Sequence, residues 1–321
     1  MPEIPRPPYP PTPLEGIEAG WEALQQCDLR TASIDSLKVR LKALAKGRIG
    51  GNTLIPTGTR LYRARNYDPT ALPSHVSLLG ARPPLSVKDL QRCNREGKSI
   101  FYCCQERLTT FRELRKLPGD RMILSEWELL RDLTVLPLGF HPEVFKRLGS
   151  GRDCPNLRKV IGFPFPEYEP ETNLLEHIFA ECLTLDVDEN EEYRYKLSIA
   201  ITEMLIEPSI SSQMPGRVNP GADGILYPSV QLSGNRNNLA IKFDIAKSHL
   251  KFIEAQEVEL VSDDERTSNI KQPRLSGPTI VTCTAAMHWE LSDGCFVANV
   301  RFFMIQQPSH SESAISYKVP D

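Results

Sequence analysis

Apolar residues recur at helical spacing in two segments near the start of the chain. Ile17, Trp21 and Leu24 lie three and four positions apart, which places them on one face of a helix. A second apolar run with the same spacing, 34–44, stands between a serine that can cap a helix and a glycine that can end one. This pattern predicts two amphipathic helices ahead of the main body of the protein.

Short apolar and alternating segments predict strands in the rest of the chain. Residues 100–104 form an apolar and aromatic run that suits a buried strand, and helical spacing follows at once in 108–114. Because proline cannot donate to a strand ladder, Pro228 either ends the strand that begins at Gly224 or places it at an edge. Further strands are predicted at 61–65, 133–136, 239–243, 279–284 and 296–304, and further helices at 173–183 and 193–206.

Size and composition are those of an ordinary globular protein. The chain has 321 residues, 40% hydrophobic and 25% charged, which permits a sizeable core and argues against wholesale disorder. Its 38 Lys and Arg residues against 41 Asp and Glu residues leave a net charge of −3, too balanced for binding duplex phosphate by bulk attraction. We therefore expect no direct binding to nucleic acid.

The lengths and positions of the apolar segments indicate where in the cell the protein is located. No apolar stretch approaches the roughly 20 residues that cross a bilayer, so we expect no membrane contact. Residues 2–13 are rich in proline, where a signal peptide would have its apolar run, and they predict an extended arm. The sequence thus predicts a cytoplasmic protein.

Eight cysteines are spread over the chain, without a CxxC pair or a histidine at metal-ligand spacing. We therefore expect no metal site. Cys103 and Cys104 lie in an apolar strand, where thiols behave as small hydrophobic side chains. A catalytic cysteine would need a nearby base, and spacing along the sequence identifies none.

Three polar residues are candidates for chemistry, although a structural role is favoured for each when it is taken alone. Arg63 shares the face of Leu61 by the two-residue alternation of a strand, so an inward Arg63 needs an anion, either an internal carboxylate or a ligand phosphate. Glu113 lies at the apolar edge of its helix, and Ser229 lies at the end of a strand. The chain lacks the GxGxxG motif of Rossmann dehydrogenases and the GxxxxGK[ST] motif of P-loop NTPases, which excludes both classes. It also lacks GxSxG, which weakens the case for a serine hydrolase.

In combination, these residues resemble the RES-domain family, which is named for an arginine, a glutamate and a serine. The resemblance covers roughly residues 55–245. The chain departs from the family at Gln91, where the family has glycine, and at Cys93, where it has phenylalanine; Arg65 and Arg95 are further arginines near the motifs. The motifs are Leu61-Tyr62-Arg63-Ala64, Arg92-Cys93-Asn94, Ile100-Phe101-Tyr102, Thr110-Phe111-Arg112-Glu113, Asp223-Gly224-Ile225-Leu226-Tyr227-Pro228-Ser229 and Asn238-Leu239-Ala240.

The resemblance implies an α+β fold similar to that of ADP-ribosyltransferases. Such a fold has a split β-sheet core flanked by helices, with NAD in the cleft. Around it we expect N-terminal helical and C-terminal extensions. The predicted organisation is a proline-rich arm with two short helices at 1–50, a RES-like NAD-binding catalytic domain at 51–250, and a C-terminal extension with strands and a mobile tail at 251–321.

The resemblance also implies an enzyme that cleaves the nicotinamide–ribose bond of NAD. The acceptor is inorganic phosphate in a phosphorylase or water in a glycohydrolase, and NAD is a substrate, so no bound cofactor is expected. Compact members are NAD-depleting toxins that an Xre-type antitoxin neutralises, and a homo-oligomer is compatible with this role. Two alternatives stay open: a mono-ADP-ribosyltransferase that modifies a protein or nucleic acid, and a non-catalytic nucleotide-binding module.

Roles for individual residues follow from the same resemblance. Glu113 is expected to stabilise the oxocarbenium-like ribose or to hold its hydroxyls. Arg63 and Arg92 are expected to bind the pyrophosphate or an incoming phosphate. Tyr102 would stack on nicotinamide or bond a ribose hydroxyl, and Ser229 would contact a phosphate or the nicotinamide end. The predicted catalytic residues are therefore Arg63, Glu113 and Ser229, and the predicted substrate-binding residues are Arg92, Tyr102, Tyr62 and Asn94.

Overall fold

The computed structural model describes most of the chain between residues 12 and 259 and four strands beyond it. The proline-rich arm before residue 12, the predicted strand at 279–284 and most of the predicted mobile tail lie outside the described residues. The described ranges are 12–46, 52–68, 70, 73, 76–117, 119–147, 169–188, 190–207, 209–210, 218–219, 221–230, 237–259, 286–292, 295–301, 304–306 and 316–318.

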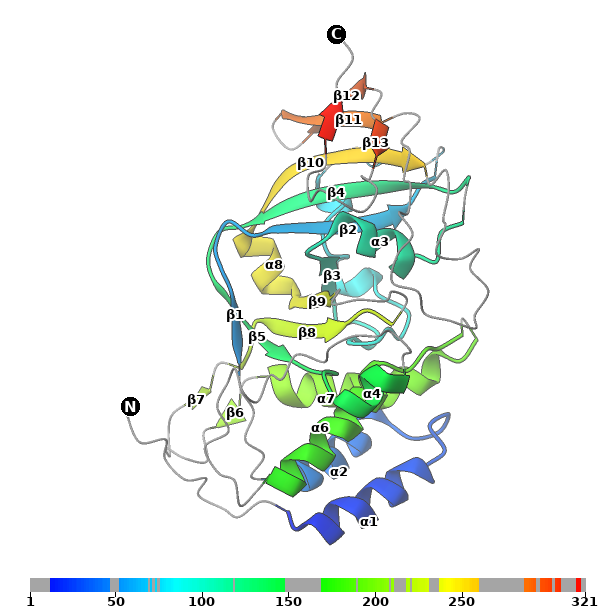
Figure 1. Ribbon diagram of the computed structural model, residues 1–321, viewed down its shortest axis with the longest axis vertical. Coiled ribbons are helices and arrows are strands. Elements are labelled where there is room, and N and C mark those ends of the chain that lie inside the picture. Colours follow the sequence, from blue (N-terminus) through cyan, green and yellow to red (C-terminus); the bar gives the residue numbers. More distant parts are fainter. Residues whose placement is uncertain are drawn as a thin grey trace.

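An eight-stranded mixed sheet forms the centre of the fold, in the order β1-β5-β8-β9-β3-β2-β4-β10 (Figure 1). Neighbouring strands are antiparallel except β5 and β8, which are parallel. The strands are β1 (Thr53–Ile55), β2 (Arg60–Asn66), β3 (Ile100–Cys104), β4 (Arg121–Leu129), β5 (Leu133–Pro137), β8 (Gly224–Pro228), β9 (Asn237–Lys242) and β10 (Leu250–Glu259).

The sheet is nearly divided between β2 and β3. Tyr62 and Cys104 form the single residue pair that joins these two strands. By contrast, β2 pairs with β4 over the seven residues from Arg60 to Asn66, and β3 pairs with β9 over its whole length. Five strands therefore lie on one side of the weak join and three on the other. The mixed sheet and the N-terminal helices confirm the α+β class and the N-terminal helical extension. The strands form one sheet with a weak join where a split pair of sheets was predicted.

Helices cover the sheet at several places, and most of them match the predicted positions. α6 (Glu169–Leu183) begins earlier than predicted, and α7 (Lys196–Ile206) follows a 3-10 turn. In the N-terminal helix α2, the side chain of Ser33 accepts a hydrogen bond from the backbone of Ser36, as a helix cap does. The remaining helices are α1 (Leu14–Gln25), α2 (Ile34–Leu44), α3 (Arg107–Glu113), α4 (Pro142–Arg147) and α8 (Phe243–His249).

Several strand predictions are confirmed, and two need correction. β8 ends at Pro228, as its proline requires, and pairs antiparallel with β9. The predicted strand 239–243 ends one residue early, because Phe243 begins α8. The predicted strand at 296–304 is divided into two. The shorter two-stranded sheets consist of β6 (Ser209–Ile210) with β7 (Val218–Asn219), β11 (Ala286–Ser292) with β12 (Cys295–Arg301), and β13 (Met304–Gln306) with β14 (Ser316–Lys318).

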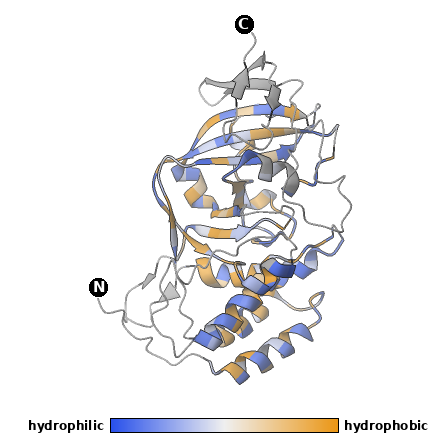
Figure 2. Cartoon of the chain, viewed as in Figure 1, coloured by the Kyte–Doolittle hydropathy of each residue, from blue (hydrophilic) through white to orange (hydrophobic). Residues whose placement is uncertain are grey.

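Two hydrophobic cores lie on the two faces of the sheet, because Leu239 and Ile241 of β9 belong to one core and the intervening Ala240 belongs to the other. Figure 2 shows the hydrophobic residues of the strands and helices in orange. In one, Trp127 stacks edge-on against Phe101 and Phe252, with ring centroids 5.4 and 5.3 Å apart. In the other, Leu37 and Leu41 of α2 join residues of α6 and α7. The N-terminal helices therefore share a core with the helices that follow the sheet strands.

Because this core is shared, we expect that shortening a buried side chain of α2 lowers the stability of the whole protein. Leu37→Ala removes a fully buried side chain, so we expect the free energy of unfolding to fall by about 2–5 kcal/mol. Urea denaturation followed by both circular dichroism and tryptophan fluorescence measures this change. The control is Val39→Ala, because Val39 lies on the same helix and is 69% exposed. An equal loss in both variants, or a transition of α2 alone, would contradict the shared core.

Candidate functional site

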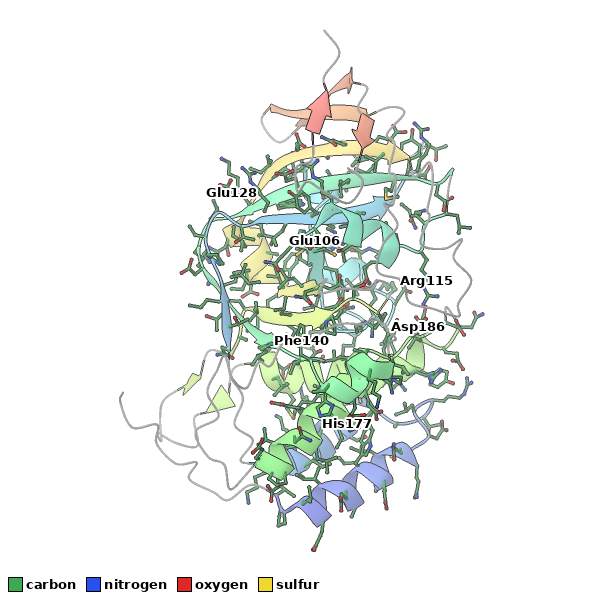
Figure 3. All side chains as sticks on the ribbon, viewed as in Figure 1. Glu106, Arg115, Glu128, Phe140, His177 and Asp186 are labelled. Atoms are coloured by element: carbon green, nitrogen blue, oxygen red, sulfur yellow. The ribbon has the colours of Figure 1, made fainter. Side chains whose placement is uncertain are left out.

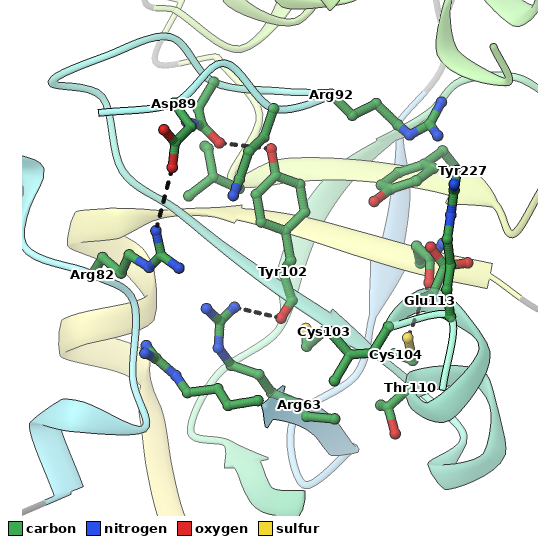
Figure 4. A pocket seen from close by; sticks show the side chains of 18 of the residues that line it. Arg63, Arg82, Asp89, Arg92, Tyr102, Cys103, Cys104, Thr110, Glu113 and Tyr227 are labelled. Carbon is green, nitrogen blue, oxygen red and sulfur yellow. Dashed lines mark hydrogen bonds and ion pairs between the residues drawn. The ribbon is translucent and has the colours of Figure 1, made fainter. Parts of the chain in front are cut away.

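A cavity of about 510 Å³ lies where the sheet is nearly split. Residues 62–66 of β2 and residues 100–104 of β3, except Phe101, contribute to its lining. Figure 4 shows Arg63 and Arg82 on one side of the cavity, Glu113 and Tyr227 on the other, and Tyr102 between them. Its volume falls within the range of small-molecule sites, about 300–1,000 Å³.

Arg63 takes the place of a missing strand partner. Its Nη1 donates a hydrogen bond of 2.7 Å to the carbonyl oxygen of Tyr102 on β3, at the level where β2 and β3 no longer pair. The guanidinium lies 5.0 Å from the centre of the Phe101 ring, and its Nε has no partner among the described residues. Burial, with the neighbouring charge of Arg65, lowers the pKa of Arg63 to about 9.

Arg65 and Arg82 extend this positive side of the cavity. Arg65 donates to the carbonyl oxygen of Gly80, and burial together with the charge of Arg82 lowers its pKa to about 10. Arg82 lies 3.9 Å from the carboxylate of Asp89, which also lines the cavity. Among the described residues this is the one ion pair that the three arginines Arg63, Arg65 and Arg82 make. The positive side therefore carries an excess of two charges, which an anion would balance.

Glu113 and Ser229 meet on the opposite side. Glu113 is the last residue of α3, and Ser229 follows the proline that ends β8. The fully buried Ser229 hydroxyl donates a hydrogen bond of 2.5 Å to Oε1 of Glu113. Oε2 has no hydrogen-bond partner within the described part of the chain, so one carboxylate oxygen is fixed and the other is available to a ligand.

The residues around this pair are largely enclosed. Burial, with a smaller contribution from the charge of Glu113, raises the pKa of Tyr227 and of Cys104 well above their usual values. The Cys104 thiol donates to Oδ1 of Asn238, a buried residue that also lines the cavity. The negative side of the cavity thus combines one carboxylate with neutral hydroxyl, thiol and amide groups.

Tyr102 is fixed by the turn that precedes its strand. Its hydroxyl accepts a hydrogen bond of 2.9 Å from the backbone N–H of Cys93 and donates one of 2.8 Å to Oδ1 of Asn94. Two backbone hydrogen bonds between Gln91 and Asn94 close the turn. Because these bonds occupy the hydroxyl, the ring of Tyr102 is the part that it can offer to a ligand.

Arg92 has a structural task in addition to its place on the cavity wall. Its Nη1 donates to the carbonyl oxygens of Leu183 and Leu185, the latter at 3.0 Å, at the C-terminal end of α6. Its guanidinium also lies 5.5 Å from the ring centre of Tyr195 and 5.9 Å from that of Tyr227. Some N–H groups of Arg92 are therefore bound to the protein backbone, and only the remaining ones could bind a phosphate.

A further ion pair connects two segments of the cavity wall. Arg115 follows α3 in a left-handed conformation, with φ of 50°, and its Nη2 lies 2.5 Å from Oδ1 of Asp186. Both residues line the cavity and are labelled in Figure 3. The pair ties the segment that carries Glu113 to the segment that follows α6.

The structure brings the predicted residues to one place. Glu113 contacts Ser229, and Tyr102 contacts both Arg63 and Asn94. Tyr62 also lines the cavity, and the guanidinium of Arg107 lies 5.1 Å from its ring centre. Of the seven predicted residues, Ser229 alone is absent from the lining itself, and it reaches the site through Glu113. The lining residues among them are Tyr62, Arg63, Arg92, Asn94, Tyr102 and Glu113.

Sequence reasoning missed three functional candidates. Arg65 follows Arg63 by two positions on the same strand, so the alternation that placed Arg63 also signals Arg65. Arg82 stands in a proline-containing loop without periodicity, and no sequence pattern signals it. Asn238 was visible as part of a motif, but its position against Cys104 depends on strand pairing.

The thiols and acidic groups do not suggest other chemistry at this site. Burial raises the pKa of Cys93 to about 11 and that of Cys103 still further, so both thiols stay protonated at neutral pH. Among the described residues, no group of three or more His, Cys, Asp or Glu side chains could hold a metal ion. None of the described helices combines the length and apolarity that a membrane span requires.

The family of the chain follows from a comparison with protein-family models. The model described as the RES domain matches residues 60–263, nearly two thirds of the chain. Comparisons with curated proteins and with solved structures give no match. The matched range includes the whole lining of the cavity and Ser229. The chain therefore belongs to the RES domain family.

Proposed function

We propose that the protein cleaves the nicotinamide–ribose bond of NAD and transfers the ADP-ribosyl group to inorganic phosphate or water. Members of the RES domain family act on NAD. The observation that carries the proposal is the separation of charge within one cavity. A cluster of arginines lies on one side, and the hydrogen-bonded pair Glu113 and Ser229 lies on the other.

The arginine cluster supports a position for the pyrophosphate of NAD. Arg63, Arg65 and Arg82 together with Asp89 carry a net charge of about +2, and a pyrophosphate in NAD carries about two negative charges at neutral pH. Burial, with the charges of neighbouring arginines, lowers the pKa of Arg63 and Arg65, and an anion at this position would offset both effects. The pyrophosphate therefore binds between β2 and the loop that carries Arg82.

The Glu113 side of the cavity then receives the nicotinamide ribose. In the reaction, the bond between C1 of the ribose and the pyridinium nitrogen breaks, and its electron pair neutralises the leaving nicotinamide. Positive charge develops on the ribose, and the carboxylate of Glu113 stabilises it. An oxygen of phosphate or water then bonds to C1, and a proton is released when water is the acceptor. Ser229 holds Glu113 in a fixed orientation through Oε1.

Tyr102 and Asn94 act as one unit in this proposal. The turn fixes the Tyr102 ring between the two charged sides of the cavity, where it contacts the ribose or the nicotinamide ring (Figure 4). Tyr62 contributes a second aromatic surface. Arg92 supports the wall beside Tyr227, and its remaining N–H donors face a phosphate acceptor.

In the cell, unrestrained loss of NAD would stop growth, so we propose that the protein is an NAD-depleting toxin controlled by an Xre-type protein that blocks the cavity. The proposal rests on the family and on the accessible cavity. The same cavity would serve a mono-ADP-ribosyltransferase, and a nucleotide-binding module would use it without catalysis. These two alternatives differ from the proposal in the fate of the ADP-ribosyl group.

One experiment tests the reaction. Purified protein is incubated with NAD labelled in the adenylate part, with and without phosphate and with and without cell extract, and the products are separated by chromatography. We expect nicotinamide release, with the label in ADP-ribose 1-phosphate when phosphate is present or in ADP-ribose without it. Label in a macromolecule would instead favour the transferase. Bound but intact NAD would favour the binding module.

Glu113→Gln is expected to lower kcat by about 10²–10³-fold while the KM for NAD changes little, because the lost charge acts on the developing ribose cation. Steady-state kinetics measure both parameters. The control is Glu18→Gln on the exposed face of α1, which should behave as the wild type. On expression in cells, the wild type should deplete NAD and Glu113→Gln should not. A Glu113→Gln variant with full kcat would refute the role of this carboxylate.

Arg65→Met is expected to raise the KM for NAD by about ten- to a hundredfold, with a smaller effect on kcat. Arg65 carries a buried charge without an ion pair among the described residues, but it also donates a hydrogen bond to the carbonyl oxygen of Gly80, so we expect the two effects to offset each other and the free energy of unfolding of the ligand-free variant to change little. Arg60→Met is the matched control for the KM, since Arg60 lies on the same strand but outside the cavity lining. Unlike Arg65, Arg60 makes ion pairs, with Glu126 and Glu128, so this control is not used for stability. Kinetics and urea denaturation test the two effects separately. A destabilised Arg65→Met variant with normal KM would show that Arg65 serves the fold alone.

A further inference from the structure

The N-terminal helices lie before the range that matches the RES domain, yet they are firmly attached to it. α2 ends at residue 44, and the match begins at residue 60. Lys38 of α2 lies 3.2 Å from Oε2 of Glu203 and 2.7 Å from Oε2 of Glu207, both at the end of α7. With the shared hydrophobic core, these ion pairs fix α2 against α7.

Arg95 connects this helix pair to the cavity wall. Its guanidinium binds two carboxylates with paired hydrogen bonds. Nη1 and Nη2 donate to Asp35 at the start of α2, at 3.0 and 2.7 Å. Nε donates to Oε1 of Glu203 at 2.7 Å, and Nη2 donates to Oε2 of the same residue. A planar guanidinium that serves two carboxylates in this way has little freedom to turn.

The electrostatics of this cluster favour the charged state of each member. Burial alone would raise the pKa of Glu203, but hydrogen bonds from Arg95 and Lys38 outweigh it and lower the pKa below the usual value. The hydrogen bond from Arg95 also lowers the pKa of Asp35. The contacts therefore persist at neutral pH and hold Arg95 from both sides.

Arg95 directly follows the turn that fixes Tyr102. Asn94 accepts the hydrogen bond from the Tyr102 hydroxyl, and Cys93 donates to it. α7 holds the same turn at a second point, because the hydroxyl of Ser198 donates a 2.7 Å hydrogen bond to the carbonyl oxygen of Arg92. The position of the Tyr102 ring in the cavity thus depends on a turn that α2 and α7 hold together.

From these contacts we infer that Arg95 is a positioning residue for NAD and that the N-terminal helix α2 is a working part of the binding site. Arg95 touches no ligand itself. It keeps the turn 91–94 in the position at which Asn94 and Tyr102 fit the nucleotide. This inference rests on the proposed function for its kinetic readout, and it assigns to residues before the matched range a role in substrate affinity.

The test compares two cations of the same helix interface. Arg95→Met removes the contacts of residue 95 with Asp35 and Glu203 and leaves the turn with its hydrogen bond from Ser198. Lys38→Met weakens the contact between α2 and α7 but leaves the contacts of Arg95 in place. We expect Arg95→Met to raise the KM for NAD by about five- to tenfold, with kcat within about twofold of the wild type. Arg95→Lys should recover part of the affinity, because it keeps the charge without the paired hydrogen bonds. Lys38→Met should lower the melting temperature without a change in KM.

A second readout is independent of turnover. Hydrogen exchange measured by mass spectrometry on a peptide that spans residues 91–95 should be faster in Arg95→Met than in Lys38→Met, because the N–H groups of the turn lose their support. If Arg95→Met does not fold, Asp35→Asn weakens the contact of Arg95 with α2 while the contact with Glu203 remains, and we expect a smaller rise in KM and in the exchange rate of residues 91–95.

The outcomes separate the inference from the proposed function. A wild-type protein that neither binds nor cleaves NAD would overturn the proposed function, and the exchange experiment would still decide the role of Arg95. Unchanged KM and unchanged exchange in both Arg95→Met and Asp35→Asn would overturn the inference. An equal rise in KM in Lys38→Met would also overturn it, because general loosening of the interface would then explain the effect.

Discussion

The site depends on the point where β2 and β3 stop pairing. Strands that pair along their whole length leave no room between them, and their backbone groups satisfy one another. β2 and β3 share a single residue pair, so the carbonyl oxygen of Tyr102 needs another donor, and Arg63 supplies it. The missing strand pairing therefore both makes room for the cavity and leaves a carbonyl oxygen to which Arg63 donates. Arg63 thus both connects the two strands and lines the cavity.

The cavity keeps opposite charges apart. Among the described residues, the three arginines on one side form no ion pair with Glu113 on the other, and Glu113 is held by a neutral hydroxyl instead. An internal ion pair between the two sides would neutralise the charges that a bound ligand could otherwise contact. Burial and neighbouring positive charge disfavour the charged state of Arg63 and Arg65, and an anion between them would offset this effect.

Local patterns predicted much of the fold, because periodicity reports which face of an element is buried. They placed the N-terminal helices, β3 and the end of β8 at Pro228 close to their observed positions. Local patterns do not show which elements pack against each other. The hydrogen bonds of Arg92 to the end of α6 and of Arg95 to Glu203 of α7 therefore could not be predicted. The triad of arginine, glutamate and serine was found only because several motifs were considered in combination. The order of the strands in the sheet brings Glu113 close to Ser229, and no pattern in the local sequence predicts that order.

The hydrophobic core beneath α1 and α2 bears on how the family segment should be isolated. Leu37 and Leu41 of α2 pack in the same core as residues of α6 and α7, so removal of α1 and α2 would expose part of the apolar surface of those two helices. An expression fragment cut at residue 60, where the family match starts, would present that surface to water and invite aggregation. The range that the family model matches is therefore shorter than the range that shares this hydrophobic core.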